Sequence, residues 1–443
     1  MSDKNTKQSL STEPYKGVRD FYPEEMAIQN HIFNTMRETV ESFGYTEYSA
    51  SILEPSELYK AKSGEEIVNE QTYSFKDRGD REVTLRPEMT PTVTRMIAAR
   101  RKDLAFPLRW YSIPNLFRYE KPQRGRLREH FQLNVDLFGI ETMDAEVEVI
   151  TVAHLLMNNF GAKDDGFVIK INNRKILNYL LQEVFELKDP ESVQAVTKLI
   201  DKKNKISAED FKTGVEKFLA DKTESFVAIM NTDSIDDFAK KAAEKTSSEV
   251  YGVKETQEVI EKLKSHGITN VVFDLTIARG FDYYTGIVFE MFDTSPTNPR
   301  AIFGGGRYDD LLSVFGTDKV PAVGFGMGDV TTRDFLETYD LLPKYKSKVD
   351  LAICPLNHDV FGFANSLAQK LRQKKVKVLV DLTERKVGQQ IQWADKHSIP
   401  YILVIGENEI KDQKFVVKEL SSGEEKTFNN EDEIAGFVKN TQS

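Results

Sequence analysis

The stretch that most constrains the fold of this chain is residues 109–139, where an apolar segment, a basic loop and an alternating segment follow one another. In the alternating segment, residues 131–138, apolar side chains occupy every second position and are separated by Gln132, Asn134 and Asp136. Successive side chains of a strand point to opposite faces, so one face should pack in a core and the other should present amides and a carboxylate. The sequence therefore predicts two antiparallel strands joined by a basic loop.

The loop between these strands concentrates positive charge. Its cations, all within residues 118–128, are Arg118, Lys121, Arg124, Arg126 and Arg128. Such cations repel one another unless an anion lies among them, and phosphate is the usual candidate. A solvated hairpin tip is the alternative interpretation of a charge run. The polar strand face beside the loop, and an Arg and a Glu at the end of the first strand, favour a ligand site.

Length and composition define the broad class of protein. The 443 residues predict two or three domains, and 40% hydrophobic with 29% charged residues is ordinary for a soluble globular protein. No apolar run reaches the ~20 residues of a membrane span and no apolar signal core opens the chain, so we expect a cytoplasmic protein. The net charge of -10 restricts nucleic-acid binding to local basic patches. The single cysteine and the scattered histidines predict no structural metal site.

The segment FRYEKPQRGRLREHFQLNVDLFG, residues 117–139, resembles motif 2 of class II aminoacyl-tRNA synthetases, in its histidyl-tRNA synthetase form. The resemblance implies that Arg118 holds the α-phosphate of ATP. It also implies that Gln132 and Asp136 bind histidine. The roles it implies for the loop are phosphate binding by Arg126 and contacts with the tRNA acceptor end by Gln123 and Arg124.

The segment LRPEMT, residues 85–90, precedes a helix expected over residues 92–101. The proline keeps its predecessor extended, so a strand should end there. A capped helix start explains these residues without any function. The segment also resembles the part of histidyl-tRNA synthetases that holds the α-amino group of histidine, which implies that role for Glu88 and Thr90.

The segment RGFDYYTGIVFE, residues 279–290, resembles the histidine-specific RGLDYY signature of the same family. A guanidinium and two phenol hydroxyls suit a carboxylate or phosphate together with a planar ring. Paired tyrosines before a strand are otherwise common packing residues. The resemblance implies that Arg279 stabilises the transition state and contacts ATP, and that Tyr283 and Tyr284 bind histidine.

Glycines dominate two later segments. Residues 304–306 are three glycines, and residues 323–329 alternate glycine with apolar residues, which suggests a flat ligand lying against the backbone. The second segment leads into a helix expected over residues 331–338. It resembles motif 3 but lacks its ATP-binding arginine, since Thr331 occupies that place. Arg333 lies two positions further on, a rotation of roughly 200° along a helix, so it is not a simple replacement. Arg126 and Arg279 are the alternative sources of charge.

The whole chain then predicts an α/β multidomain protein with a class II antiparallel-sheet catalytic core, a helical insertion and a C-terminal α/β anticodon-binding domain. In the last of these domains, strands alternate with helices, and this alternation predicts a small parallel sheet. The expected parts are a disordered tail 1–13, a first catalytic part 14–174, an insertion 175–265, a second catalytic part 266–343, a linker 344–348 and the anticodon-binding domain 349–443.

The resemblance implies a histidine–tRNA ligase that uses ATP with Mg²⁺ and binds histidine and its tRNA. The helix after GVRDFYPEE would form a homodimer interface, although an amphipathic surface helix explains it equally. The insertion would clamp the tRNA acceptor arm. The rival is the synthetase-like regulatory subunit of ATP phosphoribosyltransferase, which does not charge tRNA. The intact residues 349–443 argue against it, whereas the altered motif 3 keeps it open. Another adenylating or amide-forming class II relative is a second rival.

Overall fold

The computed structural model describes residues 10–60, 71–232, 234–244, 250–278, 283–298 and 300–440. The chain divides into two compact units, Met1–Leu342 and Pro343–Ser443, which are described separately. Residues 1–9 of the expected tail lie outside the described residues. Within the described ranges, no helix combines the length and apolarity that a membrane crossing requires.

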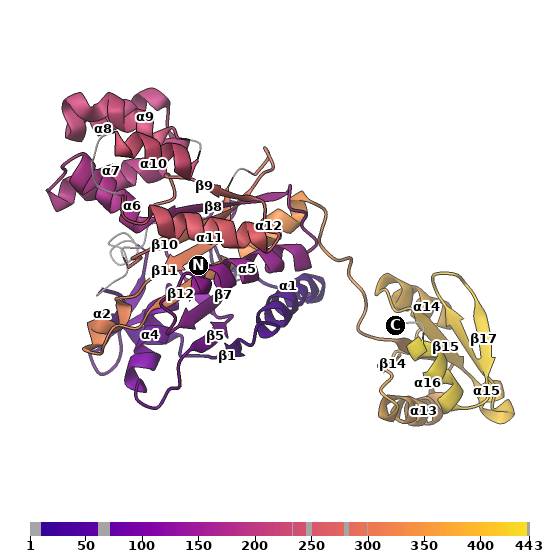
Figure 1. Ribbon diagram of the computed structural model, residues 1–443. Coiled ribbons are helices and arrows are strands. Elements are labelled where there is room, and N and C mark those ends of the chain that lie inside the picture. The colour runs from indigo at the N-terminus through magenta and orange to yellow at the C-terminus, as the bar shows by residue number, and fades with distance from the viewer. Residues whose placement is uncertain are drawn as a thin grey trace, which may run out of the picture. The chain divides into compact units, whose positions relative to one another are not determined.

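The first unit is built around a large, mostly antiparallel sheet (Figure 1). In spatial order its strands are β1 (Thr46–Glu47), β5 (Leu108–Ser112), β7 (Glu129–Phe138), β12 (Ala322–Gly328), β11 (Ala301–Arg307), β10 (Ile287–Asp293), β8 (Phe167–Asn173) and β9 (Val271–Phe273). A short strand, β6 (Asn115–Phe117), also pairs with β7. Among the described strands of this sheet, only the pairs β1–β5 and β8–β9 are parallel. The expected antiparallel pair around the basic loop is therefore confirmed, with its first strand divided into β5 and β6.

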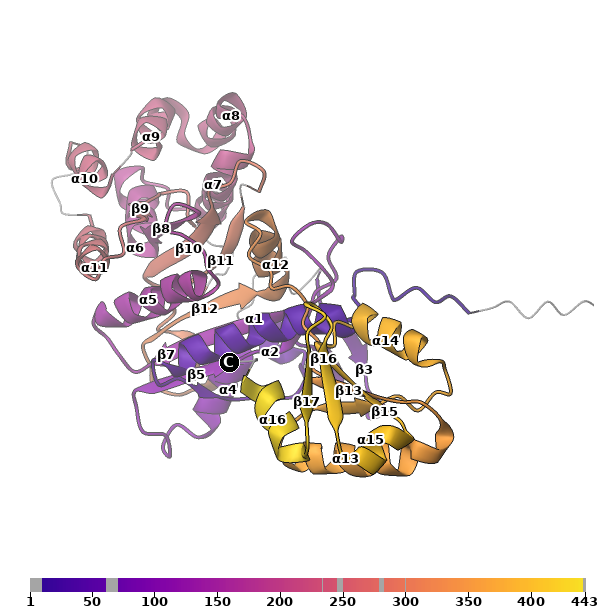
Figure 2. The same cartoon turned by 90° about the vertical axis from the view of Figure 1, so that its right-hand side faces the viewer.

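One face of the sheet forms the main core. Leu133, Val135 and Leu137 of β7 are buried in it, as the alternation predicts. Two helices, α1 (Pro23–Glu41) and α5 (Asp144–Asn159), pack against each other over this face, as Figure 2 shows. α1 buries a single stripe of side chains, so its apolar positions recur at helical spacing, whereas ten of the 16 residues of α5 are buried.

The opposite face carries a smaller core and the polar side chains of β7. Its helices are α4 (Thr90–Ala99) and the 3₁₀ segment η4 (Leu311–Phe315), which pack against each other. The same unit contains a small antiparallel sheet in the order β2 (Leu53–Pro55), β4 (Glu82–Leu85) and β3 (Tyr73–Lys76). A short helix, α2 (Glu57–Lys60), follows β2 in the chain. α4 begins two residues before the expected helix because Pro91 fits its first turn.

Residues between β8 and β9 form a helical lobe in the same unit, visible beside the sheet in Figure 1. Its segments are α6 (Arg174–Tyr179), the π-helical η1 (Leu180–Val184), α7 (Pro190–Lys202), η2 (Lys203–Lys205), α8 (Ala208–Leu219), η3 (Ala220–Lys222), α9 (Thr223–Met230), α10 (Ile235–Ala243) and α11 (Val253–Ser265). Asp189, Ser207 and Ser234 cap the starts of α7, α8 and α10 with their side chains. The last helix of the first unit is α12 (Asp329–Thr338), which starts two residues earlier than expected.

The second unit has the expected strand–helix alternation. Its sheet order is β14 (Val378–Val380), β13 (Leu351–Pro355), β15 (Tyr401–Ile405), β16 (Phe415–Glu419) and β17 (Glu425–Phe428), with the first three parallel. The helices are η5 (His358–Val360), α13 (Phe361–Gln373), α14 (Val387–Lys396), α15 (Glu407–Asp412) and α16 (Glu431–Asn440). Apolar residues fill both faces of the parallel strands, which explains their continuous apolar runs.

Candidate active site

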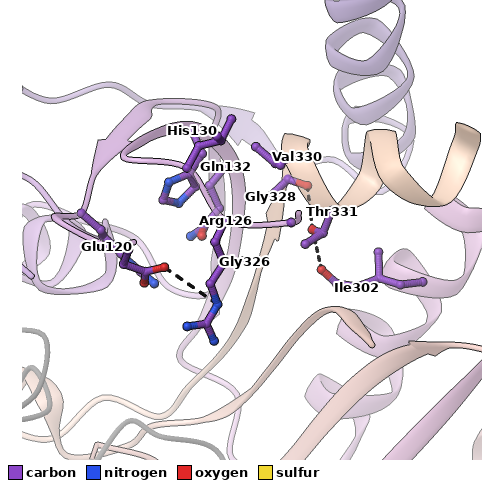
Figure 3. Close-up of a pocket in the computed structure, with 12 residues that line it drawn as sticks. Glu120, Arg126, His130, Gln132, Ile302, Gly326, Gly328, Val330 and Thr331 are labelled. Atoms are coloured by element: carbon purple, nitrogen blue, oxygen red, sulfur yellow. Dashed lines mark hydrogen bonds and ion pairs between the residues drawn. The ribbon is translucent and has the colours of Figure 1, made fainter. Parts of the chain in front are cut away.

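Two adjoining cavities lie on the polar face of the main sheet. The inner cavity, of about 200 Å³, is lined by Glu88, Thr90, Arg118, Gln132, Asn134, Asp136, Tyr283, Tyr284, Tyr308, Gly324, Phe325 and Gly326. The outer cavity, also of about 200 Å³, is lined by Arg118, Glu120, Gly125, Arg126, Leu127, His130, Gln132, Ile302, Gly326, Gly328, Val330 and Thr331 (Figure 3). Arg118, Gln132 and Gly326 line both cavities, so the two cavities adjoin each other at these residues.

The pairing of β7 with β12 gives the inner cavity its polar floor. Gly324 lies opposite Asp136 in this ladder. A Cβ atom on Gly324 would lie 2.3 Å from Asp136 Oδ1, and one on Gly326 would lie 2.5 Å from Gln132 Nε2. These two glycines therefore leave room for polar side chains of the neighbouring strand. Both glycines also line the inner cavity, so a flat ligand lying against their backbone stays a prediction.

Asp136 is a buried acceptor with unused capacity. It is 3% exposed, its Oδ1 accepts a hydrogen bond from the Tyr308 hydroxyl, and its buried Oδ2 has no hydrogen-bond partner within the described residues. Burial raises the pKa of Asp136 to about 7, although the hydrogen bond from Tyr308 acts in the opposite direction. A ligand group that donates a hydrogen bond to Oδ2 would remove this unsatisfied position.

A second carboxylate lines the same cavity. Glu88 is 2% exposed, and the Tyr283 hydroxyl lies 3.4 Å from its Oε2. Beside it, Gln132 Nε2 donates to Asn134 Oδ1 over 2.6 Å. The cavity thus combines two carboxylates, two amides and tyrosine hydroxyls, which suits a small ligand with a cationic amine and further N–H donors.

The outer cavity has a different charge. Arg118 donates from Nε to the Pro87 carbonyl over 2.9 Å, which fixes its guanidinium between the two cavities. Arg126 Nε lies 3.8 Å from Glu120 Oε2, as Figure 3 shows. Burial, together with the nearby charges of Arg118 and Arg19, lowers the pKa of His130 to about 3, so its ring is neutral at ordinary pH. Two guanidinium groups and a neutral ring suit a phosphorylated ligand with a planar part.

The structure brings most of the expected site residues together. Those that line the cavities are Glu88, Thr90, Arg118, Arg126, Gln132, Asp136, Tyr283 and Tyr284. Gln123 and Arg124 lie at the loop tip, and neither residue lines a cavity. Arg124 Nε is 3.8 Å from Asp334 Oδ2 of α12. Arg279 lies outside the described residues.

The structure of the motif 3 region explains why Arg333 cannot substitute for the arginine that motif 3 usually has at position 331. Arg333 pairs with Glu25 of α1 and, at 2.9 Å, with Glu337 of its own helix. Thr331 faces the outer cavity and donates its hydroxyl to the Ile302 carbonyl over 2.7 Å. The helical rotation predicted from the sequence therefore turns Arg333 towards α1.

Three cavity residues were not expected from the sequence. Tyr308 follows the run of glycines in β11 and meets Asp136 only through the tertiary fold. His130 alternates in phase with the polar residues of β7, which is a signal that the pattern contained. Glu120 belonged to the Arg–Glu pair at the strand end, but we assigned it no role. Within the described residues, no group of three or more His, Cys, Asp or Glu side chains is placed to hold a metal ion.

An antiparallel sheet of this order, with adjoining acidic and basic cavities on one face, defines the catalytic domain of a class II aminoacyl-tRNA synthetase. The histidyl-tRNA synthetase family model matches residues 17–329, and an anticodon-binding-domain model matches residues 350–441. The chain belongs to the histidyl-tRNA synthetase family.

Individual relatives agree over nearly the full length. The histidine–tRNA ligase of Leptospira biflexa serovar Patoc is 41% identical over 427 residues, which are 95% of this chain and 96% of that protein. The crystal structure of histidyl-tRNA synthetase from Nostoc sp. PCC 7120 superposes with a TM-score of 0.82 at 24% identity, covering 98% of this chain and all of the other, and supports the fold. A structure titled ATP phosphoribosyltransferase regulatory subunit/histidyl-tRNA synthetase, from Bacillus halodurans C, has a TM-score of 0.69 at 25% identity and covers 84% of this chain and 93% of its own.

Proposed function

We propose that this chain is a histidine–tRNA ligase that activates histidine with ATP and transfers it to the 3' end of its tRNA. The observation that carries the proposal is that Arg118 lines both of the adjoining cavities. An amino acid in the inner cavity and a nucleotide in the outer cavity would meet beside this guanidinium, where a carboxylate can reach a phosphate.

In the inner cavity, Glu88 and Thr90 receive the α-amino group of histidine. The imidazole N–H donates to Asp136 Oδ2, the position that lacks a partner in the described structure. Gln132, Tyr283 and Tyr284 complete the lining around the amino acid. Tyr308 acts as a positioning residue because it holds the other oxygen of Asp136.

In the first step, a carboxylate oxygen of histidine forms a bond to the α-phosphorus, the bond from that phosphorus to the bridging oxygen breaks, and pyrophosphate leaves with the electron pair. Arg118 neutralises charge on the α-phosphate, and Arg126 contributes charge further along the phosphates. Arg279 remains part of the proposal as a source of charge at the transition state. In the second step, the hydroxyl of the terminal adenosine attacks the activated carbonyl carbon and AMP leaves.

Mg²⁺ would enter on the triphosphate, which supplies most of its ligands, and Glu120 is the carboxylate of the outer cavity that would help to hold it. The ion supplies neutralisation of phosphate charge. The remaining residues orient the two substrates. Because the reaction needs orientation and neutralisation of phosphate charge, the site requires positive charge and no strong base.

The other partners are proposed with the same function. The second unit would bind the anticodon, Gln123 and Arg124 would approach the acceptor end, and the helical lobe would hold the acceptor arm. We also propose a cytoplasmic homodimer that pairs through α1. The large exposed side chains Tyr22 and Met26 at the start of this helix support that surface. The regulatory-subunit alternative fits less well, since residues 350–441 match an anticodon-binding domain.

The test is histidine-dependent exchange of pyrophosphate into ATP by the purified chain, followed by charging of histidine-specific tRNA. We expect both activities, with exchange limited to histidine among the amino acids. Histidine binding without exchange or charging would contradict the ligase and support the regulatory alternative. Exchange without charging would contradict only the second step.

A further inference from the structure

One wall of the outer cavity lacks charge. The lining residues from β11, β12 and α12 are Ile302, Gly326, Gly328, Val330 and Thr331, none of which is ionisable. The lining cations are Arg118 and Arg126; Arg126 lies on the other side, where Glu120 offsets its charge (Figure 3). A triphosphate bound here would need further positive charge along its outer end.

Arg300 stands at the edge of this uncharged wall. The Asp293 N–H donates to the Arg300 carbonyl over 3.1 Å, so the β10–β11 pairing continues to Arg300, immediately before β11. The register of this pairing shifts between Met291 and Phe292, so strand alternation does not carry from Ile302 to Arg300, and the contacts of the Arg300 side chain itself give its direction.

The position of the guanidinium can be fixed against Gly125, which also lines the outer cavity. A Cβ atom built on Gly125 would lie 3.4 Å from Arg300 Nη1 and 3.6 Å from Thr331 Cγ2. Asp334 Oδ2 is also 3.6 Å from this Cβ, so Arg300, immediately before β11, approaches the same point as Thr331 and Asp334 of α12. Arg300 also donates from Nη1 to the Arg124 carbonyl, which anchors it against the basic loop.

We propose that Arg300 binds the terminal phosphate of ATP and so supplies the charge that Thr331 lacks. The proposal rests on the function proposed above. A guanidinium has five N–H donors, and the bond to the Arg124 carbonyl uses one of them, so the group can hold the loop and a phosphate together. When pyrophosphate leaves in the first step, Arg300 would stabilise the charge that it carries away.

Nearby cations fit this role less well. Arg333 is engaged by Glu25 and Glu337 on the side of α1. Neither Arg124 nor Arg300 is among the residues that line the cavity, but the Arg300 guanidinium lies beside the lining residue Gly125, whereas Arg124 Nε lies 3.8 Å from Asp334 Oδ2. The alternative role for Arg300 is a structural one, in which it merely braces the loop through the Arg124 carbonyl. In that structural role, loss of Arg300 would weaken the binding of histidine, AMP, ATP and pyrophosphate alike. The phosphate-binding role predicts a loss for ATP and pyrophosphate only, so the two roles can be told apart.

The experiment measures pyrophosphate exchange by the full chain and its Arg300→Ala variant. We expect the KM values for ATP and pyrophosphate to rise about tenfold or more, the magnitude of a lost charged hydrogen bond. The KM for histidine and inhibition by AMP, which lacks the outer phosphates, should stay within about twofold. Arg78→Ala, which removes an exposed arginine from the β3–β4 hairpin, is the matched control for net charge and should leave all four values unchanged.

A second variant tests the shared location. Adding Thr331→Arg to the Arg300→Ala protein should restore most of the affinity for ATP and pyrophosphate, because position 331 reaches the same point beside Gly125. Unchanged KM values in Arg300→Ala, an equal loss for histidine and AMP, or no recovery in the double variant would overturn the proposal. Absence of exchange in the parent protein would instead refute the ligase function itself.

Discussion

Replacing Asp136 by asparagine should stabilise the free protein at high pH while it weakens histidine binding. Asp136 is 3% exposed, and its Oδ2 has no hydrogen-bond partner within the described residues. Burial raises the pKa of this carboxyl group to about 7 from the ordinary aspartate value of 3.8. A raised carboxyl pKa means that the folded protein resists ionisation, so ionised Asp136 lowers the free energy of unfolding.

The size of this effect follows from linkage. Below pH 3.8 both states are protonated and there is no cost, and above pH 7 both are ionised and the cost is complete. At 1.4 kcal/mol per pH unit the cost is about 2 kcal/mol at pH 5 and about 4 kcal/mol at pH 8. Asparagine does not titrate. The stability of Asp136→Asn relative to its parent should therefore increase by about 2.5 kcal/mol between pH 5 and pH 8, whatever the amide itself costs.

The assay is urea unfolding followed by tryptophan fluorescence. The sequence has two tryptophans. Trp110 lies opposite Asp136 in the β5–β7 pairing, whereas Trp393 belongs to the second unit. A Trp393→Phe background would make the signal specific for the catalytic unit. Protein concentration is held constant, because a dimer would make stability depend on it. The same variant should raise the KM for histidine about tenfold or more, since a charged acceptor is lost.

Asp274→Asn is the matched control because the pKa of Asp274 is shifted in the opposite direction. Burial acts against ionisation, but hydrogen bonds from Lys170 and Thr276 outweigh it and lower the pKa. Both states of this control are ionised from pH 5 to pH 8, so its loss of stability should not depend on pH in that window. A difference between Asp136→Asn and its parent that stays flat from pH 5 to pH 8 would refute our account of the buried acceptor.

Three further predictions concern other parts of the chain. Gly324→Ala places a Cβ 2.3 Å from Asp136 Oδ1, so histidine-dependent exchange should fall about 100-fold in a protein with an unchanged circular dichroism spectrum; activity near that of the parent would contradict the geometry. Glu146→Gln leaves Arg307 buried without its main counter-charge, so the free energy of unfolding should fall by about 3–5 kcal/mol in urea titrations. A loss below about 1 kcal/mol would contradict this account of the ion pair. A chain that ends at Leu342 should retain pyrophosphate exchange and lose at least about tenfold in tRNA charging, whereas loss of exchange would show that the first unit does not act alone.

Local periodicity explains what could be predicted of the catalytic face. The alternation in β7 placed Gln132 and Asp136 correctly because a strand paired on both sides has two well-defined faces. Tyr308 could not be found in this way, since it lies 172 positions from Asp136 and reaches it through the neighbouring strands. For the same reason, the glycine pattern alone could not show that a side chain from another strand lies beside Gly324.

Helix starts show the same limit on a smaller scale. α12 begins at Asp329, two residues before the expected start, and the Asp329 carboxylate accepts from the Phe131 N–H and pairs with Arg19. These partners come from β7 and from the segment before α1, so no local pattern around residue 329 contains them. The consequence is functional, because this start directs Thr331 towards the outer cavity and Arg333 away from it.

Two buried carboxylates of the catalytic unit show why burial alone does not identify a binding group. Glu146 and Asp136 are 0% and 3% exposed, and burial raises the pKa of both. Both oxygens of Glu146 accept from Arg307, over 2.5 Å and 2.6 Å, so its hydrogen-bonding capacity is met within the protein. Asp136 has only its Oδ1 satisfied, by Tyr308. The two carboxylates are equally buried, but only Asp136 keeps an oxygen that can accept a hydrogen bond from a ligand, and this distinguishes it from Glu146.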